Sequence, residues 1–143
     1  MQKALGKPVA LELETRQKAD GEPAADTLRA QGFYYQKEGA AHLVFKEGPT
    51  QNTHIRIGAG LVHVHRFGSL SGDLWFCEGS RRDTRYETPY GRLLLTVDTR
   101  QIHWDPQDLR LYIRYNLLDE TRLLSENELT IRIRERKNDE EPG

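Results

Sequence analysis

Apolar and polar residues alternate with a period of two along most of the chain between residues 32 and 135. The clearest example is segment 129–134, in which three aliphatic residues alternate with one threonine and two arginines. Because successive residues of a strand point to opposite faces, this pattern is typical of an antiparallel strand with one buried and one solvated face. We expect the three aliphatic residues to face the protein interior, and Arg132 and Arg134 to face water.

Segments of this kind recur at intervals of about ten residues, as in meandering all-β domains. They cover residues 8–17, 33–37, 41–45, 53–57, 61–66, 73–78, 85–90, 92–98, 101–104, 109–117 and 128–135. No repeat, low-complexity tract or linker divides the chain, so we predict one domain over residues 1–143. Its fold class is all-β, a single antiparallel up-and-down barrel of about 8–12 strands, with frayed tails at 1–7 and 138–143.

Two segments leave a choice between helix and strand. Residues 23–31 have a helix-forming composition between Pro23 and Gly32, but a strand there would complete a hairpin with the first strand. We favour the strand and keep a short helix as the alternative. Ser125 and Glu128 match the spacing of a helical capping box, yet the residues after them alternate with period two, which favours a strand.

Composition and charge limit the classes of function. The chain has 21 basic and 22 acidic residues, so its formal charge of −1 gives no overall field that attracts nucleic acid or an anionic membrane. No apolar run resembles a secretory signal or reaches the roughly 20 residues of a membrane-spanning helix. Cys77 is the single cysteine and cannot form an internal disulfide. We therefore expect a cytoplasmic protein that binds neither nucleic acid nor membrane.

His63 and His65 are the most prominent candidate metal ligands. They share one face of a predicted strand, and His54 on a neighbouring strand and Cys77 could extend the pair to a zinc or iron site. The alternating valines of segment 61–66 are better core candidates, which favours a solvated face for both histidines. We predict no metal and no other cofactor, and keep His54, His63 and His65 as the alternative ligand set.

Catalysis and phosphate binding have no specific support in the sequence. The G-x-S-x-G, P-loop and H-E-x-x-H motifs are absent. Cys77 follows two aromatic residues and is more typical of a small buried hydrophobic residue than of a nucleophile. Arg132, Arg134 and Arg136 could hold phosphate groups, but such a stripe is more typical of the wet face of an edge strand. We predict no catalytic residue and no enzymatic activity.

The segment Tyr-Glu-Thr-Pro-Tyr-Gly at 86–91 is the most distinctive. Pro89 removes a backbone donor and Gly91 permits unusual dihedral angles, so a bulge or sharp bend is expected between two strands. This favours a barrel corner. The alternative is a barrel mouth at which Tyr86, Tyr90 and a nearby arginine surround a ligand.

Six segments, in the same order, resemble the YwiB-like family, a bacterial domain of unknown function that is placed with the calycin, or lipocalin-like, β-barrels. They are Gly32-Phe-Tyr-Tyr, Thr53-His-Ile-Arg-Ile-Gly, Val64-His-Arg-Phe-Gly68, Tyr86-Glu-Thr-Pro-Tyr-Gly91, Leu93 to Thr99 and Leu111-Tyr-Ile-Arg-Tyr115. The resemblance covers nearly the whole chain. It implies a calycin-type barrel, a strand at 26–31 and, as in many calycins, an interior that encloses a small apolar ligand, but it implies no activity.

We therefore expect a small amphipathic ligand to bind at the mouth of a calycin-like barrel, with Arg66, Tyr86, Tyr90 and Tyr115 as its polar contacts. The alternative is a barrel filled by its own side chains that acts through its outer surface as a protein-interaction or dimerisation module. A metal-dependent enzyme is the third hypothesis. We expect the chain to be a monomer or a homodimer.

Overall fold

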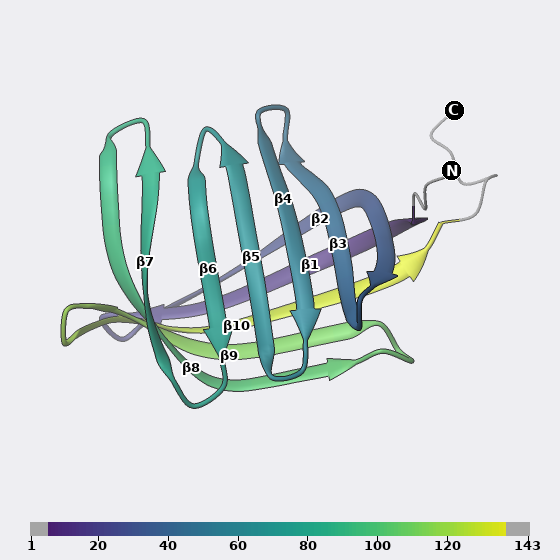
Figure 1. Ribbon diagram of the computed structural model, residues 1–143. Coiled ribbons are helices and arrows are strands. Elements are labelled where there is room, and N and C mark those ends of the chain that lie inside the picture. The colour runs from purple at the N-terminus through teal and green to yellow at the C-terminus, as the bar shows by residue number, and fades with distance from the viewer. Residues whose placement is uncertain (1–5, 137–143) are drawn as a thin grey trace.

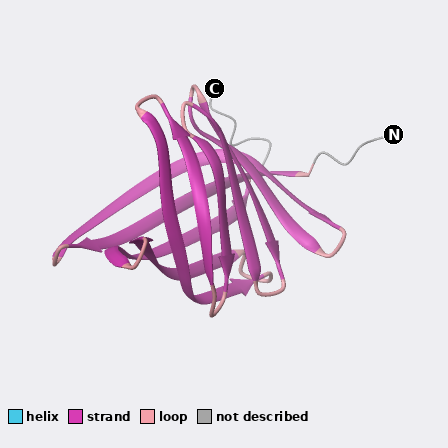
Figure 2. Cartoon of the chain, turned by 60° about the vertical axis from the view of Figure 1, so that its left-hand side comes forward, coloured by secondary structure: helices cyan, strands magenta, loops and turns pink. Residues whose placement is uncertain are grey.

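The computed structural model describes residues 6–136 of the chain. All regular structure in this part of the chain is β-strand, and Figure 2 shows the strands curving around one interior with short loops at their ends. The strands are β1 (Lys7–Ala19), β2 (Glu22–Lys37), β3 (Ala40–Gly48), β4 (Gln51–Gly58), β5 (Leu61–Gly68), β6 (Ser71–Cys77), β7 (Arg81–Thr88), β8 (Gly91–Asp105), β9 (Arg110–Asp119) and β10 (Arg122–Glu135).

Each strand pairs antiparallel with its neighbours in sequence, and β10 also pairs with β1, so the sheet closes on itself. The predicted up-and-down barrel is confirmed, with ten strands. Closure corrects the expectation that the arginine stripe lies on an edge strand, because β10 lies between β1 and β9. Arg132 lies 3.7 Å from carboxylate oxygens of both Glu12 and Glu14 on β1. Its charge therefore serves pairing across the closed sheet rather than protection of an open edge.

The barrel has two layers whose strands cross (Figure 1). Strands β3 to β7 form one layer and β1, β9 and β10 the other, while the long strands β2 and β8 pass between the layers. Gly32 lies where β2 begins to pair with β3, opposite Phe45. A Cβ at this position would stand 2.2 Å from the carbonyl oxygen of Val44, so the close approach requires glycine. On β8, a register shift between Thr99 and Gln101 marks a bulge against β9.

The inward-facing residues form one hydrophobic core. On β1 and β10, Leu11 lies opposite Ile133 and Leu13 opposite Ile131, and all four side chains are buried. Leu129 packs against the same core. Full burial of an aliphatic side chain contributes roughly 1.5–3 kcal/mol, and a one-residue slip of a strand would expose its whole apolar set. The predicted orientation of β10 is confirmed.

Two-residue turns join several strands. Asp20–Gly21 connects β1 to β2, and Glu38–Gly39 connects β2 to β3. All four residues have positive φ, with 52° for Asp20 and 55° for Glu38, which is the geometry that matches the twist of a tight hairpin. The predicted Glu38–Gly39 hairpin is confirmed. Pro89–Tyr90 connects β7 to β8, which confirms the sharp bend expected in segment 86–91.

Some predicted boundaries differ from the structure. Residues 23–37 belong to one strand, so the strand interpretation of 23–31 is confirmed and the short helix is excluded. Residues 92–104 also form one strand, because the bulge after Thr99 absorbs the break in alternation. The strand expected at 85–90 begins earlier, at Arg81, and the strand expected at 128–135 begins at Arg122.

The expected tails are described only in part. Lys7 already belongs to β1, where its Nζ lies 3.0 Å from a carboxylate oxygen of Glu135. Residues 1–5 and 138–143 lie outside the described residues. Within residues 6–136, no helix is long and apolar enough to cross a membrane.

The junction between β6 and β7 is the shortest in the barrel. Only two residue pairs join these strands, Ser71 with Glu87 and Gly72 with Tyr86. Beyond these pairs the strands enclose a groove of about 950 Å³, whose walls include Trp75 of β6 and residues of the β9–β10 turn.

Candidate functional site

An ion pair lies inside the barrel, where most of the surrounding side chains are apolar. Arg66 faces inward from β5 because it continues the alternation of Val62 and Val64. Its Nε donates a hydrogen bond to Oε2 of Glu47 at 2.9 Å, and Thr53, opposite Arg66 on β4, donates its hydroxyl to the same oxygen. The side chains of Arg66 and Glu47 are 26% and 21% exposed. Burial works to lower the pKa of Arg66, but Tyr86 and Glu47 raise it overall, so the guanidinium stays charged.

Tyr86 stands beside this pair. Gly72 lies opposite Arg66 on one side and opposite Tyr86 on the other. A Cβ at Gly72 would lie 2.0 Å from the Tyr86 ring, so glycine makes room for the ring to lie over β6 toward Arg66. The Arg66 guanidinium lies within hydrogen-bonding reach of the buried Tyr86 hydroxyl but can only donate to it, so within the described residues the hydroxyl proton has no acceptor. Burial raises the pKa of Tyr86 to about 12 against the opposing charge of Arg66, so the hydroxyl is a neutral donor at pH 7.

Tyr115 completes the polar group from the opposite layer. It lies opposite Thr99 of β8 and Asn127 of β10, and its ring meets Phe76 edge-on at a centroid distance of 4.8 Å. Burial raises the pKa of Tyr115, against the charge of Arg66. The buried hydroxyl of Thr99 also lacks a partner among residues 6–136. Buried polar atoms in folded proteins usually have a hydrogen-bond partner.

A cavity of about 260 Å³ opens beside these residues. Its walls combine the polar side chains of Glu47, Thr53, Arg66 and Tyr115 with a larger apolar set. The apolar set consists of Leu13, Leu28, Phe45, Ile55, Val64, Leu74, Phe76 and Leu129. Thr15 and Asp26 also line the cavity and are exposed, so they mark its mouth. An apolar wall with a few convergent polar groups is the usual form of a small-molecule site.

The structure brings together three of the four predicted ligand contacts, Arg66, Tyr86 and Tyr115. It does not bring Tyr90 to them, because Tyr90 lies in the β7–β8 turn and its side chain is 99% exposed. Sequence reasoning missed Glu47, which was expected in a loop. The period-two alternation of Leu43 and Phe45 continues to Glu47 and would have placed it on the inward face.

His63 and His65 lie on the outer face of the barrel, which is the face that the sequence analysis favours for them. His42 Nδ1 and His54 Nε2 are 2.9 Å apart across β3 and β4. Burial lowers the pKa of His54, and the charge of His42 lowers it further. Burial also lowers the pKa of His42, and there the charge of Arg56 lowers it further. Neighbouring cations and partial burial thus favour the neutral form of both rings.

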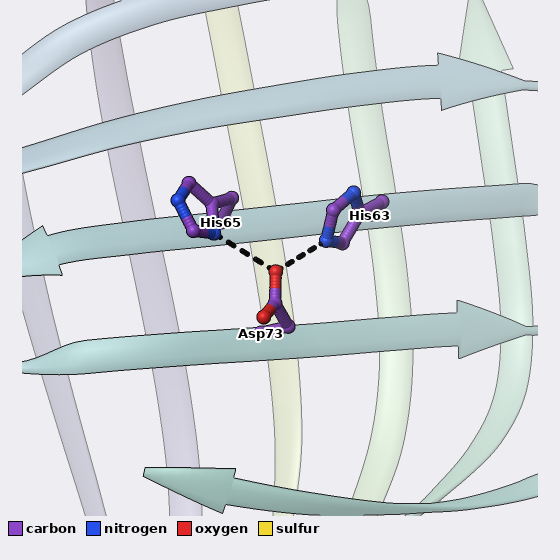
Figure 3. Close-up of side chains that lie close together, drawn as sticks. All are labelled: His63, His65 and Asp73. Atoms are coloured by element: carbon purple, nitrogen blue, oxygen red, sulfur yellow. Dashed lines mark hydrogen bonds and ion pairs between the residues drawn. The ribbon is translucent and has the colours of Figure 1, made fainter. Parts of the chain in front are cut away.

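His63 and His65 meet Asp73 of β6, a residue outside the alternative ligand set of His54, His63 and His65. His63 Nε2 lies 2.6 Å and His65 Nδ1 2.9 Å from Oδ1 of Asp73 (Figure 3). Burial works to raise the pKa of Asp73, but hydrogen bonds from both histidines lower it overall. Cys77 is free and half-buried rather than fully buried. No sequence motif points to Asp73, since its position beside the histidines follows from the register between β5 and β6.

The chain resembles known proteins in both sequence and structure. A family model described as a domain of unknown function, DUF1934, matches residues 11–131. The chain belongs to this family. The match spans the barrel from β1 to β10, so it includes the interior ion pair, the cavity and the outer histidines.

Two further matches agree with membership of DUF1934. The chain is 27% identical over 116 residues to the uncharacterized beta-barrel protein YwiB of Bacillus subtilis (strain 168), covering 77% of this chain and 81% of that protein. The crystal structure of the ywiB protein from Bacillus subtilis superposes with a TM-score of 0.82 at 24% identity, covering 92% of this chain and 93% of that one. The structural match shows a shared fold. DUF1934 carries no described function, so the function must be argued from the site.

Proposed function

We propose that the protein is a cytoplasmic, calycin-like barrel that binds one small amphipathic ligand in its interior and has no enzymatic activity. The observation that carries the proposal is the meeting of an apolar cavity with the charged Arg66, beside which the hydroxyl proton of Tyr86 has no acceptor. A buried donor without an acceptor costs about 1–3 kcal/mol. A ligand that accepts a hydrogen bond from Tyr86 recovers this free energy on binding.

The polar groups define the head of the ligand. Arg66 uses Nε for Glu47, and its two terminal amino groups are further donors. The neutral hydroxyl of Tyr86 adds another donor beside them. Donors and a positive charge at one end of the cavity favour a carboxylate or another hydrogen-bond acceptor, while Leu28, Leu74 and Leu129 favour an apolar tail.

The cavity limits the size of the ligand. Its volume of about 260 Å³ lies just below the range of ordinary drug-sized pockets. If each heavy atom occupies a volume near that of a water molecule, roughly 30 Å³, the cavity holds on the order of ten heavy atoms. A medium-chain fatty acid such as octanoate has this size and chemistry.

The alternative, an interaction or dimerisation module, has less support. The exposed large apolar side chains of the described residues are distributed over several strands and one turn: Phe33, Phe67, Tyr90, Leu93, Leu94 and Leu123. Leu93 and Leu94 are consecutive in β8 and therefore point to opposite faces. Scattered exposed residues are normal for a soluble surface, whereas a docking site needs a contiguous patch.

The test is calorimetric titration of the purified full chain with octanoate, octanol and octylammonium. We expect one octanoate per chain, and binding of octylammonium at least about tenfold weaker because its charge opposes Arg66. The variant Tyr86→Phe should weaken octanoate binding at least about tenfold, the effect of one charge-assisted hydrogen bond.

Tyr34→Phe is the matched control for this titration. Tyr34 is as buried as Tyr86, at 7% exposure, but its hydroxyl bonds Gln36, whereas Tyr86 stands beside Arg66. Its affinity for octanoate should equal that of the unmodified protein. The proposal is wrong if none of the three compounds binds saturably, or if Tyr34→Phe weakens octanoate binding as much as Tyr86→Phe does.

A further inference from the structure

We propose a second site, for a divalent metal ion of the zinc type, formed by His63, His65 and Asp73 on the outer face of the barrel. It is independent of the interior cavity, which lies on the other side of the sheet. One ligand atom from each of the three residues lies within 4.8 Å of the others. Figure 3 shows both imidazole rings turned toward the same carboxylate oxygen.

The donor atoms suit zinc in kind and in spacing. Imidazole nitrogen and carboxylate oxygen are common zinc ligands, with bond lengths that place neighbouring ligands of a tetrahedral ion about 3.3 Å apart. The two histidine nitrogens now lie 2.6 and 2.9 Å from Oδ1 of Asp73. Coordination to one ion requires these two separations to lengthen by only about 0.7 and 0.4 Å.

Regular structure holds the ligands in place. His63 and His65 are alternate residues of β5, and His65 lies directly opposite Asp73 in the pairing of β5 with β6. The His63 ring stacks on Trp75 with a centroid distance of 3.8 Å and an interplanar angle of 5°. His65 stacks on Phe67 at 5.5 Å. Ligands fixed on strands and held by packing lose little freedom when an ion binds.

The charges around the cluster are mixed. Asp73 supplies one negative charge in the cluster, and Asp83, Asp119 and Glu120 line the groove that Asp73 borders. Arg85 lines the same groove, the Arg82 guanidinium lies over the Trp75 ring at 5.6 Å, and Arg56 lies opposite His63 in the pairing of β4 with β5. The acidic groups therefore outnumber the basic ones around the groove, which favours the approach of a cation.

The arrangement provides three protein ligands, so a bound tetrahedral ion keeps its fourth position for water or another small ligand. The side chains of His63, His65 and Asp73 are 22%, 46% and 45% exposed, so the ion can enter directly from solvent. Two nitrogens and one oxygen favour zinc, copper or nickel over magnesium or calcium. We expect micromolar affinity for Zn²⁺ and none for Mg²⁺ at the same concentration.

The test is competition for Zn²⁺ between the full chain, freed of metal by a chelator, and a chromophoric chelator. We expect one Zn²⁺ per chain, and Co²⁺ in its place should give the visible absorption of a tetrahedral ion. His63→Gln and Asp73→Asn should each weaken Zn²⁺ binding at least about tenfold, while Tyr86→Phe leaves it unchanged. Circular dichroism of each variant checks that the barrel is intact.

Two control variants locate the ion. His103→Gln removes an exposed histidine of β8, and His42→Gln removes the partner of His54; neither should change Zn²⁺ affinity. Absence of saturable binding up to millimolar Zn²⁺ would overturn the proposal. So would a loss of binding in His42→Gln or His103→Gln equal to that in Asp73→Asn, since the ion would then lie elsewhere.

Discussion

Arg66 and Glu47 form the polar centre of an otherwise apolar interior, and each depends on the other. If one of the two residues is removed, the other remains a buried charge. It keeps the free-energy cost of desolvation but loses the attraction of its counterion. Thr53 supports Glu47 through the same carboxylate oxygen. The sequence could predict that Arg66 lies near the site, but not its partner, because the two residues are 19 positions apart.

Replacement of Glu47 by glutamine is expected to destabilise the fold. The variant leaves the Arg66 charge without its counterion, at a cost of about 2 kcal/mol in the free energy of unfolding, below the 3–5 kcal/mol of fully buried pairs. Urea denaturation measures this loss in the free energy of unfolding. The double variant Glu47→Gln, Arg66→Met should recover part of the loss; if it is no more stable than Glu47→Gln, the charge of Arg66 is not the cause.

The hydroxyl of Tyr86 should contribute little to stability when no ligand is bound. Tyr86→Phe removes a contact with Arg66 but also a buried donor without an acceptor, so the free energy of unfolding should change by less than about 1 kcal/mol. Tyr34→Phe removes a hydroxyl that accepts a hydrogen bond from Gln36 at 3.3 Å, and the free energy of unfolding should fall slightly. Urea denaturation of both variants checks the difference, and a clear loss of stability in Tyr86→Phe would contradict it.

At the scale of the elements, the period-two alternation predicted most strands and their inward faces. It failed where two predicted strands are one, in β2 and β8. The bulge after Thr99 shifts the alternation by one residue, and a sequence pattern cannot distinguish such a shift from the end of a strand. The position of Asp73 beside His65 was likewise beyond sequence reasoning, because it depends on pairing register.

Gly32 should be essential to the path of β2. Gly32→Ala places a Cβ 2.2 Å from a backbone oxygen and 2.8 Å from Phe45 Cβ, neither of which is the free end of a flexible side chain. We expect the free energy of unfolding to fall by about 3 kcal/mol, the upper range of overpacking effects. Gly58→Ala, whose nearest atom is 3.8 Å away, should change it by less than about 1 kcal/mol. Equal effects of the two variants would contradict the role of Gly32.

At the scale of the whole molecule, the outer histidines should make stability depend on pH. The pKa values of His42 and His54 are lowered from 6.5 in the folded state. The unfolded chain therefore binds more protons near and below pH 6.5, so stability is greatest above that pH and falls as the pH is lowered through the folded-state pKa values.

The measurement is urea denaturation between pH 7.5 and 5, with a chelator present. The variant with His42→Gln and His54→Gln should lose less stability over this range than the unmodified protein. Because both rings are only partly buried, the difference should correspond to less than one proton per histidine. An identical pH dependence of the two proteins would show that these histidines do not cause it.

The fold class and two of the polar groups that line the cavity, Arg66 and Tyr115, were accessible from sequence, but the cavity itself was not. Its volume depends on how inward side chains from both layers pack, and no single-strand pattern specifies that packing. The position of Tyr90 in a turn was also beyond prediction from the sequence pattern. Tyr90 shares a motif with Tyr86, yet the two-residue turn places it in solvent.

The central claim is that the barrel interior binds a small amphipathic molecule. The most direct measurement is nuclear Overhauser contact between unlabelled octanoate and the carbon-13 methyl groups of the protein. We predict contacts from the octanoate chain to the methyl groups of Leu28, Leu74 and Leu129, which line the cavity, and none to the exposed Leu94 or Leu123. Contacts confined to the exposed leucines, or no contact at saturating octanoate, would contradict the account.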